Sequence, residues 1–398
     1  MICVVPWTQL EICNTGKFRP CAEWNRDLVD ANGEKYNFND STTIEEVWNS
    51  ADMQNLRAQF LRGEKPDLCS KCWKQESQGL SSTRTRNLEA FPHHVKNCIS
   101  TVADSIVLLD LKLGIKCNLQ CKICCSEFSS NWAKDELDMF GQIINQYHDK
   151  DYTDQNNNWQ DIKSHAGDLE ALYLSGGEPL LLENCIELLQ DLVDNGIAQN
   201  IWLKIHTNGT IRITDKILDI LKQYKKVRLM FSIDGIGKSF EYQRYPSKWA
   251  KVESNFVQLL EHDWLDLKIS YTASILNCFD GTDVENWCNQ IGFSMQNFEI
   301  NFLRDPVYYD MSMLDENQKQ YVVSKLNNGH IDTQIKKYIK TTHQDTIENA
   351  DWKIKTREDL DNLRKYVILS LDQKKKQSLE QVSPLLAELV DGRYLGNK

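Results

Sequence analysis

The chain lacks any apolar run near the roughly 20 residues that a membrane-spanning helix needs, so no membrane partner is expected. It also lacks an excess of positive charge, because 46 Lys and Arg residues oppose 57 Asp and Glu residues, giving a formal net charge of -11. That balance argues against broad binding of nucleic-acid phosphates, and no nucleic-acid partner is expected. The first seven residues have no basic segment of the kind that opens a signal peptide. We therefore expect a cytoplasmic protein.

Cysteine, in contrast, is abundant, with 13 residues in a chain of 398. Disulfides are disfavoured in a reducing compartment, so clustered cysteines there more often bind metal. Two groups have the spacing of ligands: Cys13, Cys21, Cys69 and Cys72, then Cys117, Cys121 and Cys124. The other six are expected to be small core residues: Cys3, Cys98, Cys125, Cys185, Cys278 and Cys288.

The second group has C-x3-C-x2-C spacing and follows an apolar, strand-like run over 105–114. Three thiolates are one short of the four that close a zinc site or cover a four-iron cluster. Two interpretations follow from the spacing. One is a [4Fe-4S] cluster with an iron open to a small ligand, and the other is zinc completed by Cys125 or a distant His.

The first hundred residues carry the four-cysteine group. Gly16 indicates a turn, so Cys13 and Cys21 are expected on the two arms of a hairpin. A capping box at Thr43 and a stop at Gly63 predict two helices before the C-x2-C pair at 69–72. Zinc and a fully covered [4Fe-4S] cluster both fit four such cysteines. His93 and His94 lie in the linker 74–104, where loop residues are expected rather than ligands.

From residue 105 the pattern alternates between strands and helices, with strand-like runs at 105–113, 169–175, 200–206, 227–233, 266–276 and 296–303. This alternation predicts parallel strands joined by crossovers. Six such units predict an α/β fold with a partial (β/α)6 TIM-like barrel, a small N-terminal cysteine-rich domain and a helical C-terminal tail. In such barrels the chemistry lies at the carboxyl ends of the strands.

Small and polar residues follow the expected strands, in chain order. The cysteine loop follows the first strand, Gly176-Gly177-Glu178-Pro179 the second and Thr207-Asn208-Gly209 the third. Ser232 to Gly235 end the fourth strand, and the fifth ends near Ile275. Each of these motifs alone is an ordinary turn. Their succession behind the three cysteines predicts one shared site.

These motifs resemble those of radical S-adenosylmethionine (SAM) enzymes of the SPASM/twitch subgroup, and the resemblance covers residues 1 to about 305. It implies that the three cysteines hold a [4Fe-4S] cluster to which S-adenosylmethionine binds. Contacts with that cofactor are implied for Ile123, Gly176, Gly177, Glu178, Pro179, Thr207, Asn208, Ser232, Asp234, Arg244 and Ile275. Glu178 would accept from its amino group, and Arg244 would pair with its carboxylate.

The four N-terminal cysteines resemble the single-cluster twitch pattern, with Gly16 to Cys21 matching its Gly-x4-Cys element. Position 78 is Gln, so the later cysteines of a full SPASM domain are missing. The resemblance implies a second [4Fe-4S] cluster on Cys13, Cys21, Cys69 and Cys72. The order departs from the family, because such domains usually follow the catalytic core.

The resemblance implies reductive cleavage of S-adenosylmethionine to a 5′-deoxyadenosyl radical, which removes hydrogen from a substrate. The electron would come from a donor such as a flavodoxin or ferredoxin. The substrate, a peptide or protein or a small metabolite, is unidentified, and no catalytic base is named. Candidate substrate contacts near the last strands are Tyr271, Glu299, Asn301 and Arg304. The alternative is a non-catalytic zinc- or iron-sulfur-binding protein on a degenerate barrel.

We therefore divide the chain into an auxiliary cluster domain with linker over 1–100, a core over 101–305 and a helical region over 306–398. The stretch 148–160 is polar and rich in Asn, which predicts a solvated insertion or a lid. Helices are expected over 314–326, 333–340 and 359–371. Lys374, Lys375 and Lys376 are expected on a solvated helix face.

Overall fold

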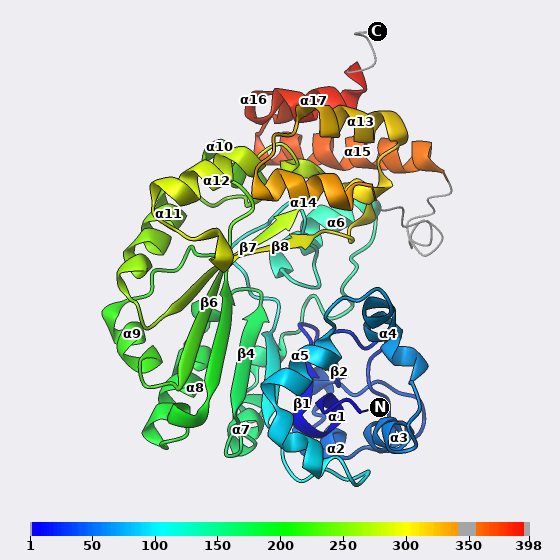
Figure 1. Ribbon diagram of the computed structural model, residues 1–398, viewed down its shortest axis with the longest axis vertical. Helices are drawn as coiled ribbons and strands as arrows, with labels where there is room; N and C mark the ends of the chain where they lie inside the picture. Colours follow the sequence, from blue (N-terminus) through cyan, green and yellow to red (C-terminus); the bar gives the residue numbers. More distant parts are fainter. Residues whose placement is uncertain (1, 341–355, 394–398) are drawn as a thin grey trace.

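The computed structural model describes residues 2–340 and 356–393. Its strands form one sheet in the order β2-β1-β3-β4-β5-β6-β7-β8. The bounds are β1 Gln9–Ile12, β2 Phe18–Arg19, β3 Leu108–Leu113, β4 Ala171–Gly176, β5 Trp202–Thr207, β6 Lys226–Ser232, β7 Asp266–Ala273 and β8 Phe298–Phe302. All neighbours are parallel except β1 and β2. The predicted α/β class and the six-stranded open barrel, β3 to β8, are confirmed (Figure 1).

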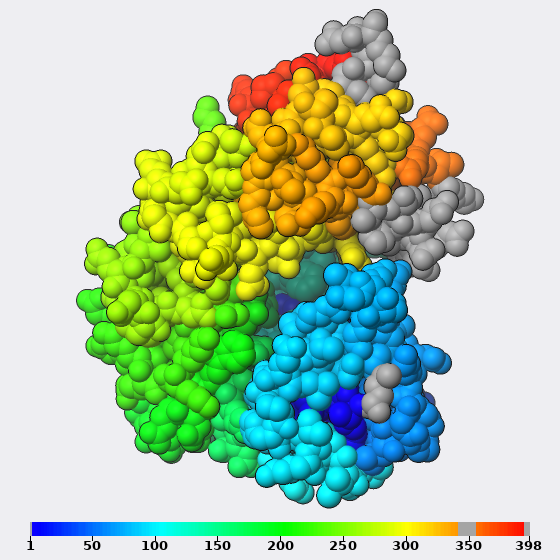
Figure 2. All heavy atoms as spheres, viewed as in Figure 1, coloured from blue at the N-terminus to red at the C-terminus, as the bar shows by residue number. Residues whose placement is uncertain are grey.

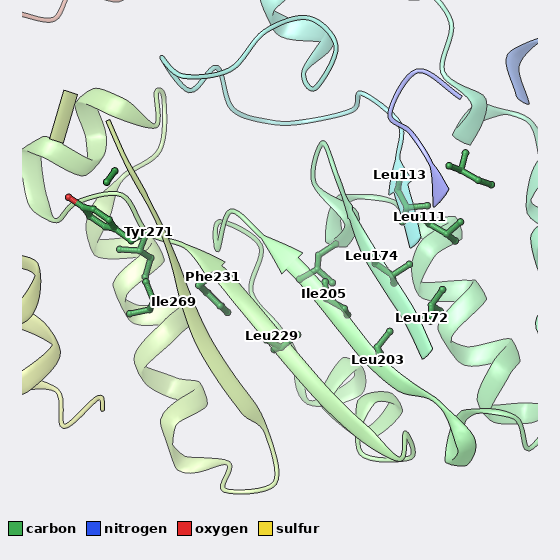
Figure 3. Close-up of a cluster of buried hydrophobic side chains, with 14 of the residues drawn as sticks. Leu111, Leu113, Leu172, Leu174, Leu203, Ile205, Leu229, Phe231, Ile269 and Tyr271 are labelled. Atoms are coloured by element: carbon green, nitrogen blue, oxygen red, sulfur yellow. The ribbon is translucent and has the colours of Figure 1, made fainter. Parts of the chain in front are cut away.

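Helices on the outer side connect the barrel strands. They are α6 Ala133–Phe140, α7 Asn156–Ser164, α8 Glu183–Asp194, α9 Asp215–Leu221, α10 Gly237–Gln243, α11 Trp249–Val257 and α12 Gly281–Gln290. Alternate residues of each strand are aliphatic or aromatic and pack against these helices, as Figure 3 shows for Leu111, Leu174, Ile205, Leu229 and Ile269. The side chains between them face the barrel interior, because successive residues of a strand point to opposite faces.

The N-terminal region joins this sheet. β1 and β2 form the predicted hairpin, with Gly16 at a positive φ of 79° between them. β1 also pairs in parallel with β3, so the barrel sheet continues into the N-terminal region. Around it lie α1 Val5–Thr8, α2 Ile44–Trp48, α3 Ala51–Leu61, α4 Ser70–Ser77 and α5 Thr83–Ala90. The capping box at Thr43 is present, with Glu46 as its partner.

The prediction for 148–160 is wrong. Tyr152, Trp159 and Ile162 are buried, and α7 is the packed crossover helix between β3 and β4. The Tyr152 hydroxyl donates to the Lys112 carbonyl at 2.9 Å, and the Ile115 amide donates to Asp151 at 2.8 Å. A few apolar anchors therefore outweigh the polar composition of this segment, and they hold the backbone that leads into the cysteine loop.

The C-terminal region is helical, as predicted, with α13 Glu316–Lys325, α14 His330–Tyr338, α15 Arg357–Lys375, α16 Leu379–Val382 and α17 Pro384–Asp391. The prediction of a solvated lysine face is wrong for Lys375, which is buried and pairs with Asp135 at 3.0 Å. The α15 helix also pairs Asp372 with the buried Lys122 of the cysteine loop at 2.9 Å. In the described ranges no helix is long and apolar enough to cross a membrane. Figure 2 shows a hollow between the blue N-terminal region and the yellow atoms near β8.

Candidate cofactor and cluster sites

The loop with Cys117, Cys121 and Cys124 follows β3 and is held from two sides. The amides of Gln120 and Lys122 donate to the carbonyls of Tyr245 and Gln243, at 2.7 and 2.8 Å. From the other side, Asn131 Nδ2 donates to the Cys117 carbonyl at 2.7 Å and Trp132 Nε1 donates to the Cys121 carbonyl at 3.1 Å. The three thiols are therefore placed by backbone hydrogen bonds.

All three cysteines are partly buried. Burial raises the pKa of Cys117 to about 12, raises the pKa of Cys121 above the usual thiol value and raises that of Cys124 well above it. Two polar groups reach them: Asn208 Nδ2 lies 3.8 Å from Cys117 Sγ and Arg244 Nη1 lies 3.9 Å from Cys121 Sγ. Buried thiolates need compensating positive charge, so this donor set fits a metal cluster better than free thiolates.

The two glycines after β4 let the backbone meet the cysteine loop. The Gly177 amide donates to the Gly114 carbonyl at 3.2 Å, and the Glu178 amide donates to the Lys116 carbonyl at 2.9 Å. A Cβ on Gly177 would lie 2.1 Å from the Lys116 carbonyl oxygen, and Gly176 has a φ of +120°. Only glycine fits this approach. Pro179 then begins a short 3-10 turn.

Glu178 joins the ends of β4 and β5. Its buried carboxylate accepts from Thr207 Oγ1 at 2.8 Å, from the Asn208 amide at 2.7 Å and from the Leu180 amide at 3.2 Å. Burial raises its pKa to about 7, although the three donors act in the opposite direction. Both of its oxygens thus have partners within the protein, and they hold Asn208 beside Cys117.

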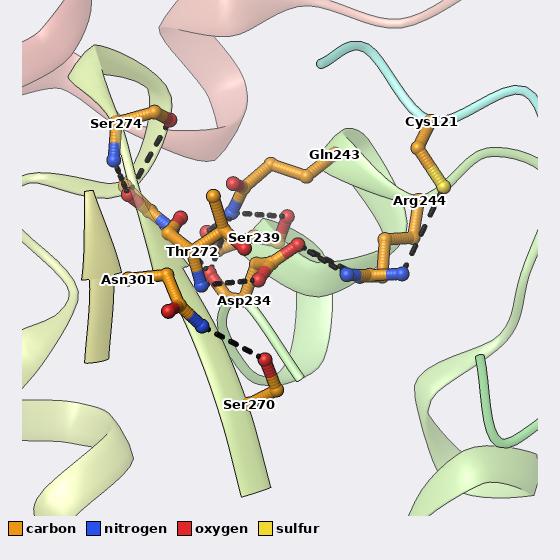
Figure 4. A network of polar contacts seen from close by, with 10 residues as sticks. Cys121, Asp234, Ser239, Gln243, Arg244, Ser270, Thr272, Ser274 and Asn301 are labelled. Atoms are coloured by element: carbon orange, nitrogen blue, oxygen red, sulfur yellow. Dashed lines mark hydrogen bonds and ion pairs between the residues drawn. The ribbon is translucent and has the colours of Figure 1, made fainter. Parts of the chain in front are cut away.

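Arg244 and Asp234 form a buried ion pair behind Cys121 (Figure 4). Arg244 donates to Asp234 Oδ2 through Nε at 2.9 Å and through Nη2 at 2.6 Å, which leaves Nη1 near the thiol. The other oxygen of Asp234 accepts from the Thr272 amide at 2.8 Å. Burial lowers the pKa of Arg244, but Asp234 and Cys121 outweigh it and raise the pKa above the usual value.

The other predicted contacts lie around the same edge of the sheet. Ser232 ends β6, and the buried Ile275 opens a 3-10 turn directly after β7. Ile123 lies inside the cysteine loop and lines a cavity of about 870 Å³ together with Cys124 and Arg304. Of the substrate candidates, Tyr271 is a fully buried core residue, whereas Glu299 and Asn301 lie on β8.

The barrel interior is polar, which was not predicted from the sequence. Ion pairs there join Lys112 to Glu11 and Asp110, and Arg228 to Asp266. On β5, Lys204 lies over the Tyr173 ring at 5.6 Å, and His206 is one layer closer to the cysteine loop. Aliphatic side chains usually fill such barrels. The strand alternation of polar with apolar residues is the signal that could have revealed this lining.

The N-terminal cysteines gather in a different set from the predicted one. Cys21, Cys69 and Cys72 line one narrow cavity, and the fourth cysteine in it is Cys3. Cys13 is not among its lining residues and instead lies on the barrel side, where its Sγ donates to Glu11 at 3.4 Å. Alternation along β1 could have indicated this, because Glu11 and Cys13 share the polar face of that strand.

The cysteine sulfurs are spread more widely than a zinc site requires. Zinc–sulfur bonds of about 2.3 Å in a tetrahedron place the sulfurs about 3.8 Å apart. Within residues 2–340 and 356–393, no three metal-ligating atoms that include a cysteine sulfur lie within 4.8 Å of one another.

Comparisons with known proteins match two segments of the chain. Residues 111–264 match the Radical SAM superfamily, and residues 3–73 match SPASM, an iron-sulfur cluster-binding domain. A curated relative, the probable GTP 3′,8-cyclase of Methanocaldococcus jannaschii, is 25% identical over 177 residues, which are 43% of this chain and 57% of that protein.

Solved structures with a similar arrangement include native anSMEcpe with bound AdoMet, at a TM-score of 0.41 and 18% identity, covering 55% of this chain and 58% of that one. Another is Streptococcus suis SuiB bound to the precursor peptide SuiA, at a TM-score of 0.35 and 14% identity, covering 82% and 79%. The chain spans less than two thirds of the length of the cyclase and of anSMEcpe.

His206 is half-buried inside the barrel, and its environment predicts how the stability of the protein changes in acid. Burial, with Lys204 and Lys112 nearby, lowers its pKa from 6.5 to about 3. Below pH 6.5 the His206 side chain therefore binds a proton in the unfolded chain but not in the folded chain. The free energy of unfolding falls as the pH drops from 6.5 toward 3. This site adds a slope of at most about 1.4 kcal/mol per pH unit.

Urea unfolding at pH 7, 6 and 5 should show a shallower loss of stability for His206→Asn than for the wild type. His148→Asn is the matched control, because the His148 ring bonds only within its own turn, to the Asn145 carbonyl at 3.1 Å. Equal slopes for His206→Asn and the wild type would contradict the assignment.

Proposed function

We propose that the chain is a radical S-adenosylmethionine enzyme with an iron-sulfur domain of the SPASM type, as its two matched segments indicate, and that it cleaves S-adenosylmethionine reductively and removes hydrogen from a polar substrate. The observation that carries the proposal is the set of three partly buried thiols at the carboxyl end of an open barrel, with loops from β4, β5 and β6 bonded around them. When bound there, a [4Fe-4S] cluster would supply one electron to the sulfonium of S-adenosylmethionine.

Each residue near the thiols has a distinct part in the proposal. Gly176 and Gly177 let the end of β4 pack against the backbone of Leu113 and Lys116 beside the cysteine loop, and the resemblance implies that the same backbone contacts the cofactor. Glu178 is assigned to position Thr207 and Asn208, in addition to the contact with the cofactor's amino group that the resemblance implies. Arg244 provides a buried cation beside Cys121 for the cofactor's carboxylate, with Asp234 holding the guanidinium in place.

For the second cluster we propose the ligands Cys3, Cys21, Cys69 and Cys72, with Cys3 in place of Cys13. The four line one cavity, and the SPASM match begins at residue 3. Four thiolates cover every corner of a [4Fe-4S] cluster and leave no iron open to substrate. We therefore assign this cluster to electron transfer with the substrate radical, as in an oxidation.

The substrate proposal rests on the barrel interior and the adjoining cavity. Charged and polar side chains line the interior, and the cavity beside Cys124 measures about 870 Å³. That volume holds a metabolite or a peptide segment. A polar lining favours a substrate with charged groups, because burying charges without partners is costly. Peptide or protein maturation and oxidation of a small metabolite both remain within the proposal.

We place the electron donor on the outer side of the cysteine loop. A groove of about 370 Å³ there is lined by the exposed Lys238, Lys248 and Lys376 and by the buried Lys375, and Lys248 pairs with Glu241 at 2.9 Å. Lys375 Nζ donates to Gln120 Oε1 at 3.1 Å, so the groove lies one residue from Cys121. A basic groove on a chain of net charge -11 would attract an acidic carrier such as a flavodoxin or ferredoxin.

The proposed activity is tested by purifying the protein without oxygen. We expect about eight irons per chain, from two four-iron clusters, and 5′-deoxyadenosine after adding dithionite and S-adenosylmethionine. Cys117→Ser should remove about four irons and abolish cleavage, because three ligands are the minimum in this site. Bound zinc with no cleavage in the wild type would refute the proposal.

The two candidates for the fourth auxiliary ligand are separated by a pair of variants. Cys3→Ser should lower the iron content by up to about four per chain and still permit cleavage of S-adenosylmethionine. Substrate turnover should stop in that variant if the second cluster carries electrons. Cys13→Ser is the matched control and should keep both clusters. Iron loss in Cys13→Ser with full iron in Cys3→Ser would reverse the assignment.

Charge reversal tests the donor surface. Replacing the exposed Lys238 and Lys376 by Glu should slow 5′-deoxyadenosine formation at least about tenfold with reduced flavodoxin at low salt. The rate with dithionite should not change, because a small reductant needs no docking surface. A control with Lys216→Glu and Lys222→Glu makes the same charge change on α9 and at its C-terminal end, outside the groove. Equal slowing in both double variants would contradict the location.

A further inference from the structure

A second type of ligand cluster lies at the opposite end of the sheet. His93 and His94 lie in the 3-10 helix η3 (Pro92–Asn97), and Glu170 directly precedes β4. Their ligating atoms, two imidazole nitrogens and a carboxylate oxygen, all lie within 4.8 Å of one another. In the described part of the chain, no other three His, Cys, Asp or Glu residues meet that distance. The cysteine loop follows the carboxyl ends of the strands, whereas Glu170 marks the amino end of β4.

The spacing of these atoms matches a shared metal ion. His93 Nε2 lies 3.0 Å from both carboxylate oxygens of Glu170, and His94 Nε2 lies 2.8 Å from Oε1. Zinc bonds to nitrogen and oxygen of about 2.0 to 2.2 Å, with angles of 90° to 109°, place two ligand atoms about 2.8 to 3.6 Å apart. Only a small outward shift of the side chains would admit the ion.

The backbone around the cluster is anchored. The Glu170 amide donates to the Val107 carbonyl, and the Glu170 carbonyl accepts from Trp202, both at 2.8 Å. Phe91, one residue before η3, is buried against Val107, Leu108 and Ala171. The Asn97 side-chain amide lies 3.3 Å from His94 Nδ1. With its oxygen turned to the ring, this amide would accept from Nδ1 and leave Nε2 free for a metal.

We propose that His93, His94 and Glu170 bind one divalent transition-metal ion, with zinc as the best match. Two neutral imidazoles and one carboxylate are a common donor set for zinc, and three protein ligands leave further positions for water. The ion would join the linker after α5 to the start of β4. It would thereby tie the N-terminal region to the amino end of the barrel. The proposal is independent of the two iron-sulfur clusters.

The test uses cluster-loaded protein without oxygen, with zinc chloride as the probe. Titration calorimetry at pH 7.5 should show one zinc per chain in the wild type, with a rise in melting temperature. His93→Ala combined with His94→Ala should weaken binding by more than about 100-fold and remove that rise. Iron content and 5′-deoxyadenosine formation should stay unchanged, because the site is remote from the cysteine loop.

His165→Ala is the matched control, because His165 also lies beside two carboxylates, those of Asp161 and Glu45. It should bind zinc like the wild type. Equal zinc binding by the wild type and the double variant would overturn the proposal. Absence of binding by the wild type up to millimolar zinc would also overturn it, while leaving the proposed radical chemistry untouched.

Discussion

The structure depends on the contact between the cysteine loop and the end of β4. The loop presents three partly buried thiols, and two of its side chains help to hold it: Asn118 donates to Thr210 at 2.8 Å and Lys122 to Asp372 at 2.9 Å. The backbone of Gly177 and Glu178 binds the segment that leads into it, and a Cβ at 177 would collide with the Lys116 carbonyl. The close contact therefore requires glycine at this position. Because β4 carries the glycine pair, the end of β4 positions the cysteine loop relative to the sheet.

From this contact a chain of hydrogen bonds runs across the tops of the strands. Glu178 accepts from Thr207 and from the Asn208 amide, and Asn208 reaches Cys117. On the other side Asp234 holds Arg244 against Cys121. The burial that raises the pKa values of the thiols also strengthens these hydrogen bonds, because the local dielectric is low. Rigid strands thus support a site made almost wholly of loops.

The outer and inner faces of the barrel sheet have different functions. Apolar residues on the outer face pack against the helices and stabilise the fold, as Leu174 and Ile205 do. The inner face does not pack against the helices, and it carries Lys112, Lys204 and Arg228. A polar interior costs stability, which the outer layer and the ion pairs offset. This polar interior is the basis for the proposal of a charged substrate next to the cysteine loop.

The sequence alone determined the alternation of strands and helices, the order of the strand-end motifs and the two groups of cysteines, because those features follow from local periodicity and spacing. Tertiary structure decided which cysteines meet. The hairpin forms as predicted, but pairing of β1 with β3 directs Cys13 toward Glu11 and the barrel, while α1 returns Cys3 to Cys69 and Cys72. Likewise, Tyr152 and Trp159 find their core only once β3 and β4 are adjacent. Contacts between side chains that are far apart in the sequence depend on the order of the strands in the sheet, and no local sequence pattern encodes that order.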